Sequence, residues 1–157
     1  MQPEPHAWIR LRHSLTRVLP YTPAQLFTLV GDVEAYPQFV PWVTRLTTFN
    51  RACEDDGVVE FDAEAVVGFS FVQERFCTHV RLDSRSRVVD VALLSGPFSR
   101  LTNRWSLAPH PGGATLTFDI DFAFKSRLLD GLLAANFERA VNRLVACFED
   151  RAKVLYG

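Results

Sequence analysis

Apolar and polar residues alternate along several stretches of this chain. Between residues 59 and 67 every second residue is apolar, and Glu60, Asp62 and Glu64 lie between them. A period of two is typical of a β-strand with one buried face. The clearest case spans residues 115–124, where the apolar positions are Leu116, Phe118, Ile120, Phe122 and Phe124. Similar patterns predict strands at residues 10–19, from residue 43 onward, and at residues 69–82, 88–94 and 98–107.

Two short helices are predicted between the first and second strands. Thr22 is followed by a proline, which suits the first helical position, and Gln25 can complete a capping box with Thr22. Asp32 is then expected to cap a second helix that continues through residue 35. The Tyr36-Pro37 pair should end that helix, because the residue before a proline is disfavoured in the helical conformation.

A long helix is predicted at the end of the chain. Ser126 can cap its start, and Asp130 suits its first turn because the helix dipole stabilises a carboxylate there. Apolar residues then recur at helical spacing, at Leu129, Leu133, Phe137, Ala140, Leu144 and Phe148. A helix of roughly 30 residues at about 1.5 Å per residue would be about 45 Å long.

The order of these elements indicates an α+β architecture. Hairpin-linked strands, with turns at residues 83–86 and 109–113, are followed by one long helix, over which a curved antiparallel sheet can wrap. No repeat, low-complexity segment or linker interrupts the chain. We therefore expect a single domain over residues 1–157, in which residues 1–9 form a loosely ordered extension.

The composition adds one unusual feature, a total of 13 phenylalanine residues in 157. Aromatic side chains bury large areas, so these must either fill a core or line a cavity, and composition does not decide between the two. A strongly bent sheet closed by one helix does not always fill the space beneath it with side chains. Such a gap is where a ligand could bind.

Charge and cysteine content exclude several classes of protein. The formal net charge of −1 provides no overall field to attract DNA or an acidic membrane. Arg10, Arg12 and Arg17 lie close together, and they form either a solvated strand edge or a local patch for phosphates, lipid headgroups or ribosomal RNA. Three widely spaced cysteines favour reduced thiols over disulfides or a zinc site. We see no secretory signal and no apolar stretch near the roughly 20 residues that span a bilayer, so we expect a cytoplasmic protein, peripheral at the inner membrane at most.

Candidate catalytic groups are sparse. The four histidines are scattered without metal-binding spacing, and no nucleophile elbow or phosphate-binding glycine loop occurs. His79 lies on a predicted strand, where a structural role is expected. Glu60, Asp62 and Glu64 are expected to form a solvated face. Arg100 and Arg104 form either a surface ladder or a contact to a ligand head group. We therefore expect no enzyme, no catalytic residue, no metal and no covalent cofactor.

Three segments together resemble one known family. Residues 26–42 read LFTLV, then a glycine, then DVEAYPQFVPW, residues 96–98 read GPF with Leu101, Asn103 and Trp105 after them, and residues 122–129 read FAFKSRLL. These blocks resemble the coenzyme-Q-binding branch of the START-like superfamily of polyketide cyclases, dehydrases and lipid-transport proteins. The likeness covers nearly the whole chain in the right order. Val40 and Val43 depart conservatively from the family pattern.

The resemblance implies a helix-grip fold with a hydrophobic cavity. It also implies non-enzymatic binding of ubiquinone or a similar polyprenyl lipid, as a carrier or chaperone that supports respiratory electron transport. An alternative from the same family is a ribosome-associated toxin that binds the large ribosomal subunit and blocks subunit joining. A cyclase or aromatase, as in more distant helix-grip proteins, is a third possibility that needs acid–base groups aimed into the pocket.

The ligand-binding residues that we predict are those of an apolar pocket and its mouth. Two loops that contain prolines, at residues 39–42 and 94–98, would form the mouth, and the last strand and the long helix would bound the cavity. Each segment also has a simpler structural interpretation, as a core plug or an ordinary turn. The full set is Phe39, Pro41, Trp42, Phe61, Phe69, Phe71, Leu94, Pro97, Phe98, Leu101, Trp105, Phe122, Leu129, Leu132, Leu133 and Phe137.

Overall fold

A computed structural model describes residues 11–54, 56–69, 72–125 and 136–157. Within them, seven antiparallel strands form one sheet in the order β1-β7-β6-β5-β4-β3-β2. The strands are β1 (Leu11–Leu19), β2 (Val43–Cys53), β3 (Val58–Phe69), β4 (Val72–Asp83), β5 (Val88–Ser95), β6 (Phe98–His110) and β7 (Gly113–Phe124). The helices are α1 (Pro23–Gly31), the 3-10 helix η1 (Val33–Gln38) and α3 (Phe137–Tyr156).

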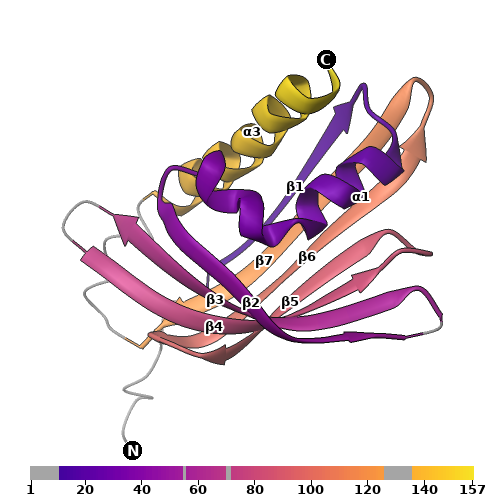
Figure 1. The fold of residues 1–157 in the computed structure, drawn as a ribbon. Coiled ribbons are helices and arrows are strands. Elements are labelled where there is room, and N and C mark those ends of the chain that lie inside the picture. Colours follow the sequence, from indigo (N-terminus) through magenta and orange to yellow (C-terminus); the bar gives the residue numbers. More distant parts are fainter. Residues whose placement is uncertain (1–10, 55, 70–71, 126–135) are drawn as a thin grey trace, which may run out of the picture.

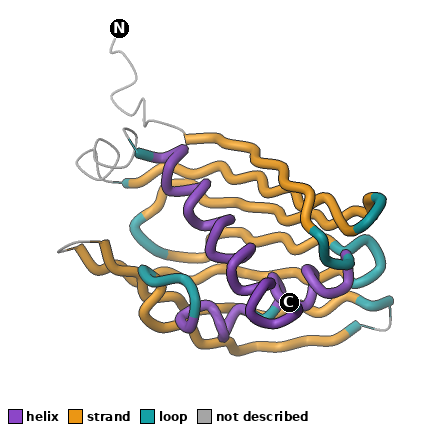
Figure 2. The backbone as a smooth tube through the Cα atoms, turned by 90° about the horizontal axis from the view of Figure 1, so that it is seen from above, coloured by secondary structure: helices purple, strands orange, loops and turns teal. Residues whose placement is uncertain are grey.

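The helices cover one face of the sheet, which we call the inner face. Figure 1 shows the curved sheet beneath α1 and α3, and Figure 2 shows α3 crossing over the strands when the molecule is seen from above. This arrangement confirms the predicted helix-grip architecture. Ser126, Asp130 and the start expected for the long helix lie outside the described residues, as does the N-terminal extension. The predicted length was wrong: α3 begins at Phe137 and has 20 residues, and Asn136 before it has a non-helical backbone, so the predicted continuous helix of roughly 30 residues does not run unbroken into α3.

The capping box of α1 forms as the sequence predicts. The backbone N–H of Gln25 donates to the Thr22 hydroxyl over 3.0 Å, and the backbone N–H of Thr22 donates to the Gln25 side chain over 2.9 Å. These two bonds satisfy N–H groups that a helix start would otherwise leave without partners. The sequence therefore fixes where the chain turns from β1 onto the inner face.

The prediction for the second helix was wrong in two respects. η1 continues through Pro37 to Gln38, and the Asp32 side chain makes no capping hydrogen bond. A 3-10 turn accepts the fixed φ of proline, and the carbonyl of Tyr36 accepts from the backbone N–H groups of Phe39 and Val40, which closes the helix beyond Pro37. The Tyr36 hydroxyl donates to the carbonyl of Val30 and ties η1 to α1.

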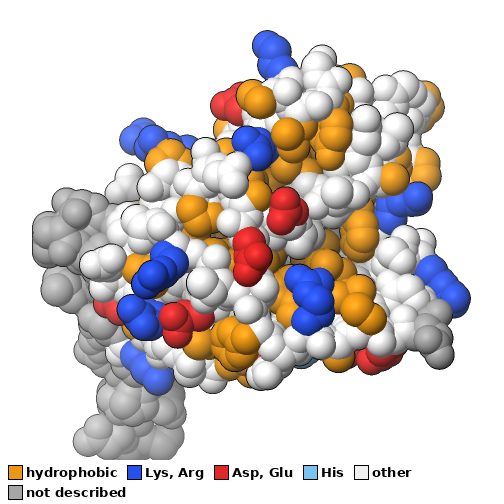
Figure 3. Space-filling view, in the orientation of Figure 1, with side chains coloured by type: hydrophobic (Ala, Val, Ile, Leu, Met, Phe, Trp, Pro, Cys, Tyr) orange, Lys and Arg blue, Asp and Glu red, His pale blue; other side chains and the backbone are white. Residues whose placement is uncertain are grey.

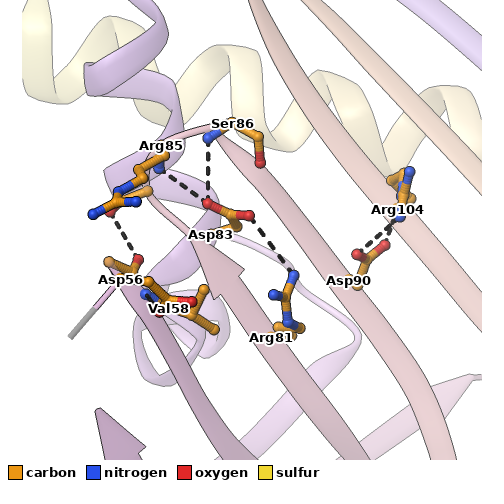
Figure 4. Close-up of polar contacts among 10 residues, drawn as sticks. Asp56, Val58, Arg81, Asp83, Arg85, Ser86, Asp90 and Arg104 are labelled. Atoms are coloured by element: carbon orange, nitrogen blue, oxygen red, sulfur yellow. Dashed lines mark hydrogen bonds and ion pairs between the residues drawn. The ribbon is translucent and has the colours of Figure 1, made fainter. Parts of the chain in front are cut away.

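Both predicted hairpin turns occur. In the β4–β5 turn, an oxygen of Asp83 accepts from the backbone N–H groups of Arg85 and Ser86 over 3.1 and 3.2 Å (Figure 4). These bonds, above all the one from Ser86, lower the pKa of the Asp83 carboxyl. Between β6 and β7 the turn is shorter than predicted, because the two strands pair until His110 faces Gly113.

A bulge in β6 decides which of its side chains reach the core. Phe98 pairs with Phe124, but Arg100 pairs with Ala123, so the register against β7 shifts by one residue between them. Simple alternation would place Phe98 and Trp105 on opposite faces. The bulge reverses the alternation, and both side chains are buried on the inner face.

Candidate functional site

Aromatic side chains gather in two clusters on the inner face. The first aromatic cluster joins β4, β6 and β7 to the start of α3, and its members are Phe76, Phe98, Phe122, Phe124 and Phe137. The ring centroids of Phe98 and Phe124 are 5.0 Å apart, and those of Phe122 and Phe137 are 4.9 Å apart. Offset and edge-on pairs at this spacing stabilise packing beyond the area that they bury.

The second aromatic cluster lies under the middle of α3, and its members are Tyr36, Phe39, Trp105, Phe118 and Phe148. Phe148 is its centre, with ring centroids 4.6 Å from Trp105 and 5.1 Å from Phe39. The Tyr36 ring packs edge-on against Phe148 over 5.1 Å. Burial, with a smaller effect from Asp32, raises the pKa of the Tyr36 hydroxyl, so this group stays neutral.

Most predicted pocket residues that the structure describes reach the interior. Phe61, Phe98, Leu101, Trp105, Phe122 and Phe137 are all buried in one hydrophobic core. The prediction for Leu94 was wrong. Its side chain points outward, in alternation with the inward residues of β5, and is 54% exposed. Pro97 is half-buried in the β5–β6 turn. Phe71, Leu129, Leu132 and Leu133, and the side chain of Phe69, lie outside the described part of the chain.

A groove of about 430 Å³ runs between η1, the loop after it and α3. Two predicted residues, Phe39 and Pro41, line the groove, and the guanidinium groups of Arg143 and Arg151 lie along it. Arg151 lies 5.3 Å from the centre of the Phe39 ring, and Arg143 lies 5.9 Å from that of Trp42. Since Phe39 also packs on Phe148, it belongs both to the wall of the groove and to the second aromatic cluster.

Between the two clusters, one inward residue from each of five neighbouring strands forms a central row. Strand pairing places these residues side by side in the order His13, Ile120, Asn103, Val91 and Val80. Two of the five are polar: His13 at the edge of the row, whose ring packs edge-on against Phe137 over 6.3 Å, and Asn103 at its centre. The side-chain oxygen of Asn103 is buried without a hydrogen-bond partner among the described residues. In the sequence, Asn103 stands out only as part of the family motif that includes Leu101 and Trp105. Its inward direction follows from alternation with Leu101 and Trp105 once the bulge is known.

The outer face of the sheet is polar, and its charges are paired. A shallow depression of about 670 Å³ crosses β1, β7, β6, β5 and β4 there. Arg104 forms a two-pronged pair with Asp90 over 2.7 and 3.1 Å (Figure 4). Arg100 binds Asp121 over 3.1 Å, so these two arginines are a surface ladder and do not face the interior.

The expected solvated carboxylate face is instead part of a hydrogen-bonded group. His79 lies on the outer face, with one ring nitrogen 2.9 Å from Glu60 and the other 2.8 Å from Asp62. Its hydrogen bonds to Glu60 and then to Asp62 raise the pKa of His79. The bond to His79 lowers the pKa of Glu60, and bonds to Asn50 and His79 lower that of Asp62. Glu64 pairs with Arg75 over 3.5 Å.

The predicted arginine patch near the N-terminus is also paired. Arg12 lies 3.8 Å from Asp121, and Arg17 lies 3.4 Å from Glu149 on α3, while Arg10 is outside the described residues. On the face in Figure 3, basic and acidic side chains are interspersed rather than gathered by sign. Among the described residues we find no cluster of metal-binding side chains, and no helix long and apolar enough to cross a membrane.

Comparison with known proteins gives one matching family, and the relatives include toxins and coenzyme Q-binding proteins. The family model described as polyketide cyclase / dehydrase and lipid transport matches residues 19–149. A ribosome association toxin, RatA, of Rickettsia prowazekii is 34% identical over 143 residues, which cover 88% of this chain and 93% of the toxin. A mitochondrial coenzyme Q-binding protein, COQ10 homolog B, of Xenopus laevis is 32% identical over 152 residues, covering 94% of this chain and 60% of that protein.

Solved structures support the same fold. An 18 kDa protein of Caulobacter crescentus is 55% identical, with a TM-score of 0.79 and coverage of 94% of this chain and 99% of that one. The Zhui aromatase/cyclase of a Streptomyces species has a TM-score of 0.73 at 15% identity, over 92% of this chain and 93% of the enzyme. At that identity the likeness concerns the fold alone.

Proposed function

The chain belongs to the polyketide cyclase/dehydrase and lipid transport family, and from this premise we propose that it binds a polyprenyl quinone without changing it chemically. The ligand would lie between the inner face of the sheet and α3. The observation that carries the proposal is the inner face itself, where two aromatic clusters flank the central row, in which Val80 is buried and the other four residues are half-buried. The likeness to a coenzyme Q-binding protein across 94% of the chain supports the same ligand class.

The energetics of an isoprenoid tail explain why such a protein would be useful. Burial of each CH₂-sized group is worth about 0.8 kcal/mol, so a five-carbon unit gains roughly 4 kcal/mol on leaving water. Aromatic walls such as Phe98, Phe122 and Trp105 also suit a flat quinone ring, because rings stack on one another. An apolar interior therefore offsets the cost of keeping a quinone outside a membrane.

The groove beside Phe39 is the entrance that fits this proposal. Phe39 lines the groove and also packs on Phe148, so rotation of this one ring would connect the groove to the interior beside Phe148. The groove is lined by two arginines, Arg143 and Arg151, and one carboxylate, Asp150, so its net positive charge matches the anionic headgroups of a membrane surface, where a quinone would be collected. A peripheral membrane contact at this groove is part of the proposal.

The test uses one substitution at two sites. Val91→Phe adds a ring to the central row on the inner face, and Val18→Phe adds the same ring on the outer side of β1, where Val18 is 56% exposed. Thermal unfolding is measured with and without ubiquinone-2, because a ligand that binds only the native state must raise the Tm. At about 100 times the dissociation constant the expected gain is about 2.7 kcal/mol for the wild type and for Val18→Phe, and none for Val91→Phe.

The same variants without ligand test whether there is unfilled space between the central row and α3. If the central row borders a gap, Val91→Phe leaves the stability of the free protein within about 1 kcal/mol of the wild type, whereas overpacking a filled core costs about 1–3 kcal/mol. The proposal fails if ubiquinone-2 does not stabilise the wild type. It fails equally if Val91→Phe binds the quinone as well as Val18→Phe does.

A second candidate function is ribosome association, favoured by the likeness to RatA over 93% of that toxin. The arginines for which a contact to RNA was one of the two interpretations weigh against it, because Arg12 and Arg17 each have an acidic partner. Co-sedimentation with large ribosomal subunits at low and high salt separates the two candidates, since phosphate contacts weaken as salt rises. Salt-sensitive co-sedimentation together with no effect of quinone would favour the ribosome.

A further inference from the structure

The central row holds a polar side chain, Asn103, whose buried oxygen has no partner among the described residues. Asn103 lies on β6 between Leu101 and Trp105, which are 8% and 4% exposed, and the residues on either side of it, Thr102 and Arg104, point outward. Its side chain therefore points inward. The residue as a whole is half-buried, and it also borders the outer-face depression.

The neighbours of Asn103 are apolar on both sides. Strand pairing places Ile120 of β7 beside it on one side and Val91 of β5 on the other. Along its own strand, Leu101 leads to the first aromatic cluster and Trp105 belongs to the second. In the part of the chain that the structure describes, the buried oxygen of the amide has no hydrogen-bond partner. An acceptor buried in this way destabilises the free protein.

α3 passes above this position. Phe137 packs on the first cluster and Phe148 on the second, and about 16 Å of helix separates them. Val141 and Val145 lie buried between these two contacts. A ligand between the helix and the central row would thus have rings at both ends, apolar walls, one amide at the centre and the His13 imidazole at the edge.

We propose that Asn103 is the residue that recognises the polar head group of the ligand. A ring hydroxyl would donate to its buried side-chain oxygen, as in a hydroquinone. After a half-turn of the amide, the side-chain nitrogen would donate to a ring carbonyl, as in the quinone. One side chain therefore serves both oxidation states of the head group, while the isoprenoid tail gains its affinity from apolar contact alone. This inference rests on the proposed function and names its specificity-determining residue.

The deciding variant is Asn103→Leu, which keeps the shape of the side chain and removes its polarity. If the amide serves ligand binding and does not stabilise the fold, the variant without ligand will have a higher Tm than the wild type without ligand. Its affinity for ubiquinone-1, a head group with a short tail, should fall by about 3- to 10-fold, the range that one neutral hydrogen bond carries. The Tm of the ligand-free protein and the dissociation constant are both obtained by measuring Tm as a function of ligand concentration.

Two controls separate recognition from structure. Squalene, a hydrocarbon of isoprene units without a head group, should bind the wild type and Asn103→Leu equally. Thr102→Val, one residue away on the outer face, should leave the affinity for ubiquinone-1 unchanged. If Asn103→Leu does not fold, Asn103→Val is measured in its place, because a β-branched residue suits a strand.

The outcomes distinguish recognition by Asn103 from quinone binding as such. Loss of affinity for ubiquinone-1, with unchanged affinity for squalene and a raised Tm of the free variant, supports Asn103 as the recognition residue. Equal affinity of the wild type and Asn103→Leu for ubiquinone-1 overturns this inference and leaves the proposed function intact. A lowered Tm with weaker binding of both ligands shows a structural role for Asn103 and also overturns it. A wild type that binds neither ligand removes the proposed function, and the inference with it.

Discussion

Replacement of Phe148 by alanine tests how α3 is held on the sheet. Phe148 is 1% exposed and is the one side chain of the second aromatic cluster contributed by α3. Its ring contacts Trp105 from β6 and Phe39 and Tyr36 from the η1 region. Removing the ring deletes contacts to the sheet and to η1 at once.

These contacts allow an estimate of how much the free energy of unfolding should fall. Phe→Ala in a packed core costs about 3–5 kcal/mol, from lost burial plus the cavity that remains. Its three aromatic neighbours are held by two separate elements, β6 and the η1 region, and cannot all close the cavity, so we expect a value in the upper half of that range. Against a total stability of about 5–15 kcal/mol for a domain, the variant should still fold.

The assay is equilibrium unfolding in urea, analysed by linear extrapolation with the slope compared between proteins. Val154→Ala is the matched control, because Val154 lies on the same helix and is 76% exposed, and its effect should stay within about 0.5 kcal/mol. If Phe148→Ala costs no more than Val154→Ala, α3 does not dock through this cluster, and the site described above loses one wall.

Two further predictions concern the outer face and the β5–β6 turn. His79→Gln should destabilise the protein most near about pH 5.5. Because the pKa of His79 is raised, its contribution to the free energy of unfolding is complete below the ordinary histidine pKa of about 6.5 and is lost as pH rises through the raised value. The lowered pKa values of Glu60 and Asp62 keep both carboxylates charged at about pH 5.5. Thermal unfolding of both proteins at about pH 5.5 and 8.5 should show the gap narrowing at the higher pH, and a constant gap would contradict this. Gly96→Ala should cost about 1–3 kcal/mol in urea unfolding, because Gly96 has a φ of +148° and a Cβ there would lie 2.5 Å from the Cβ of Phe76. An unchanged midpoint would show that the turn and the first aromatic cluster are not in close contact.

Local signals in the sequence were sufficient for the elements and for their order. The period-two pattern of β7 and the capping box at Thr22 and Gln25 depend on neighbours within a few residues, and the structure confirms both. Pro37 misled the prediction because a 3-10 helix tolerates it, which a rule for α-helices does not consider.

The site depended on contacts that are distant in sequence. The bulge in β6 arises from its pairing with β7, and without it Phe98 and Trp105 could not be placed on one face. The acidic partners of Arg12 and Arg17 come from β7 and α3, so the apparent basic patch could not be recognised as paired from sequence. Asn103 became informative only once its strand, its inward direction and its apolar neighbours were known together.

The central claim is that an apolar ligand occupies the space between the inner face and α3, and Ile120 gives the most direct test of it. The chain has two isoleucines, Ile9 and Ile120, so a protein labelled at the isoleucine δ1-methyl groups gives a spectrum that Ile120→Leu assigns at once. Ile120 belongs to the central row, beside Asn103. With ubiquinone-2 bound, we predict nuclear Overhauser contacts between the Ile120 methyl group and ligand protons. A ligand that raises the Tm yet shows no contact with Ile120 and leaves its methyl signal unmoved would place binding elsewhere and contradict the account.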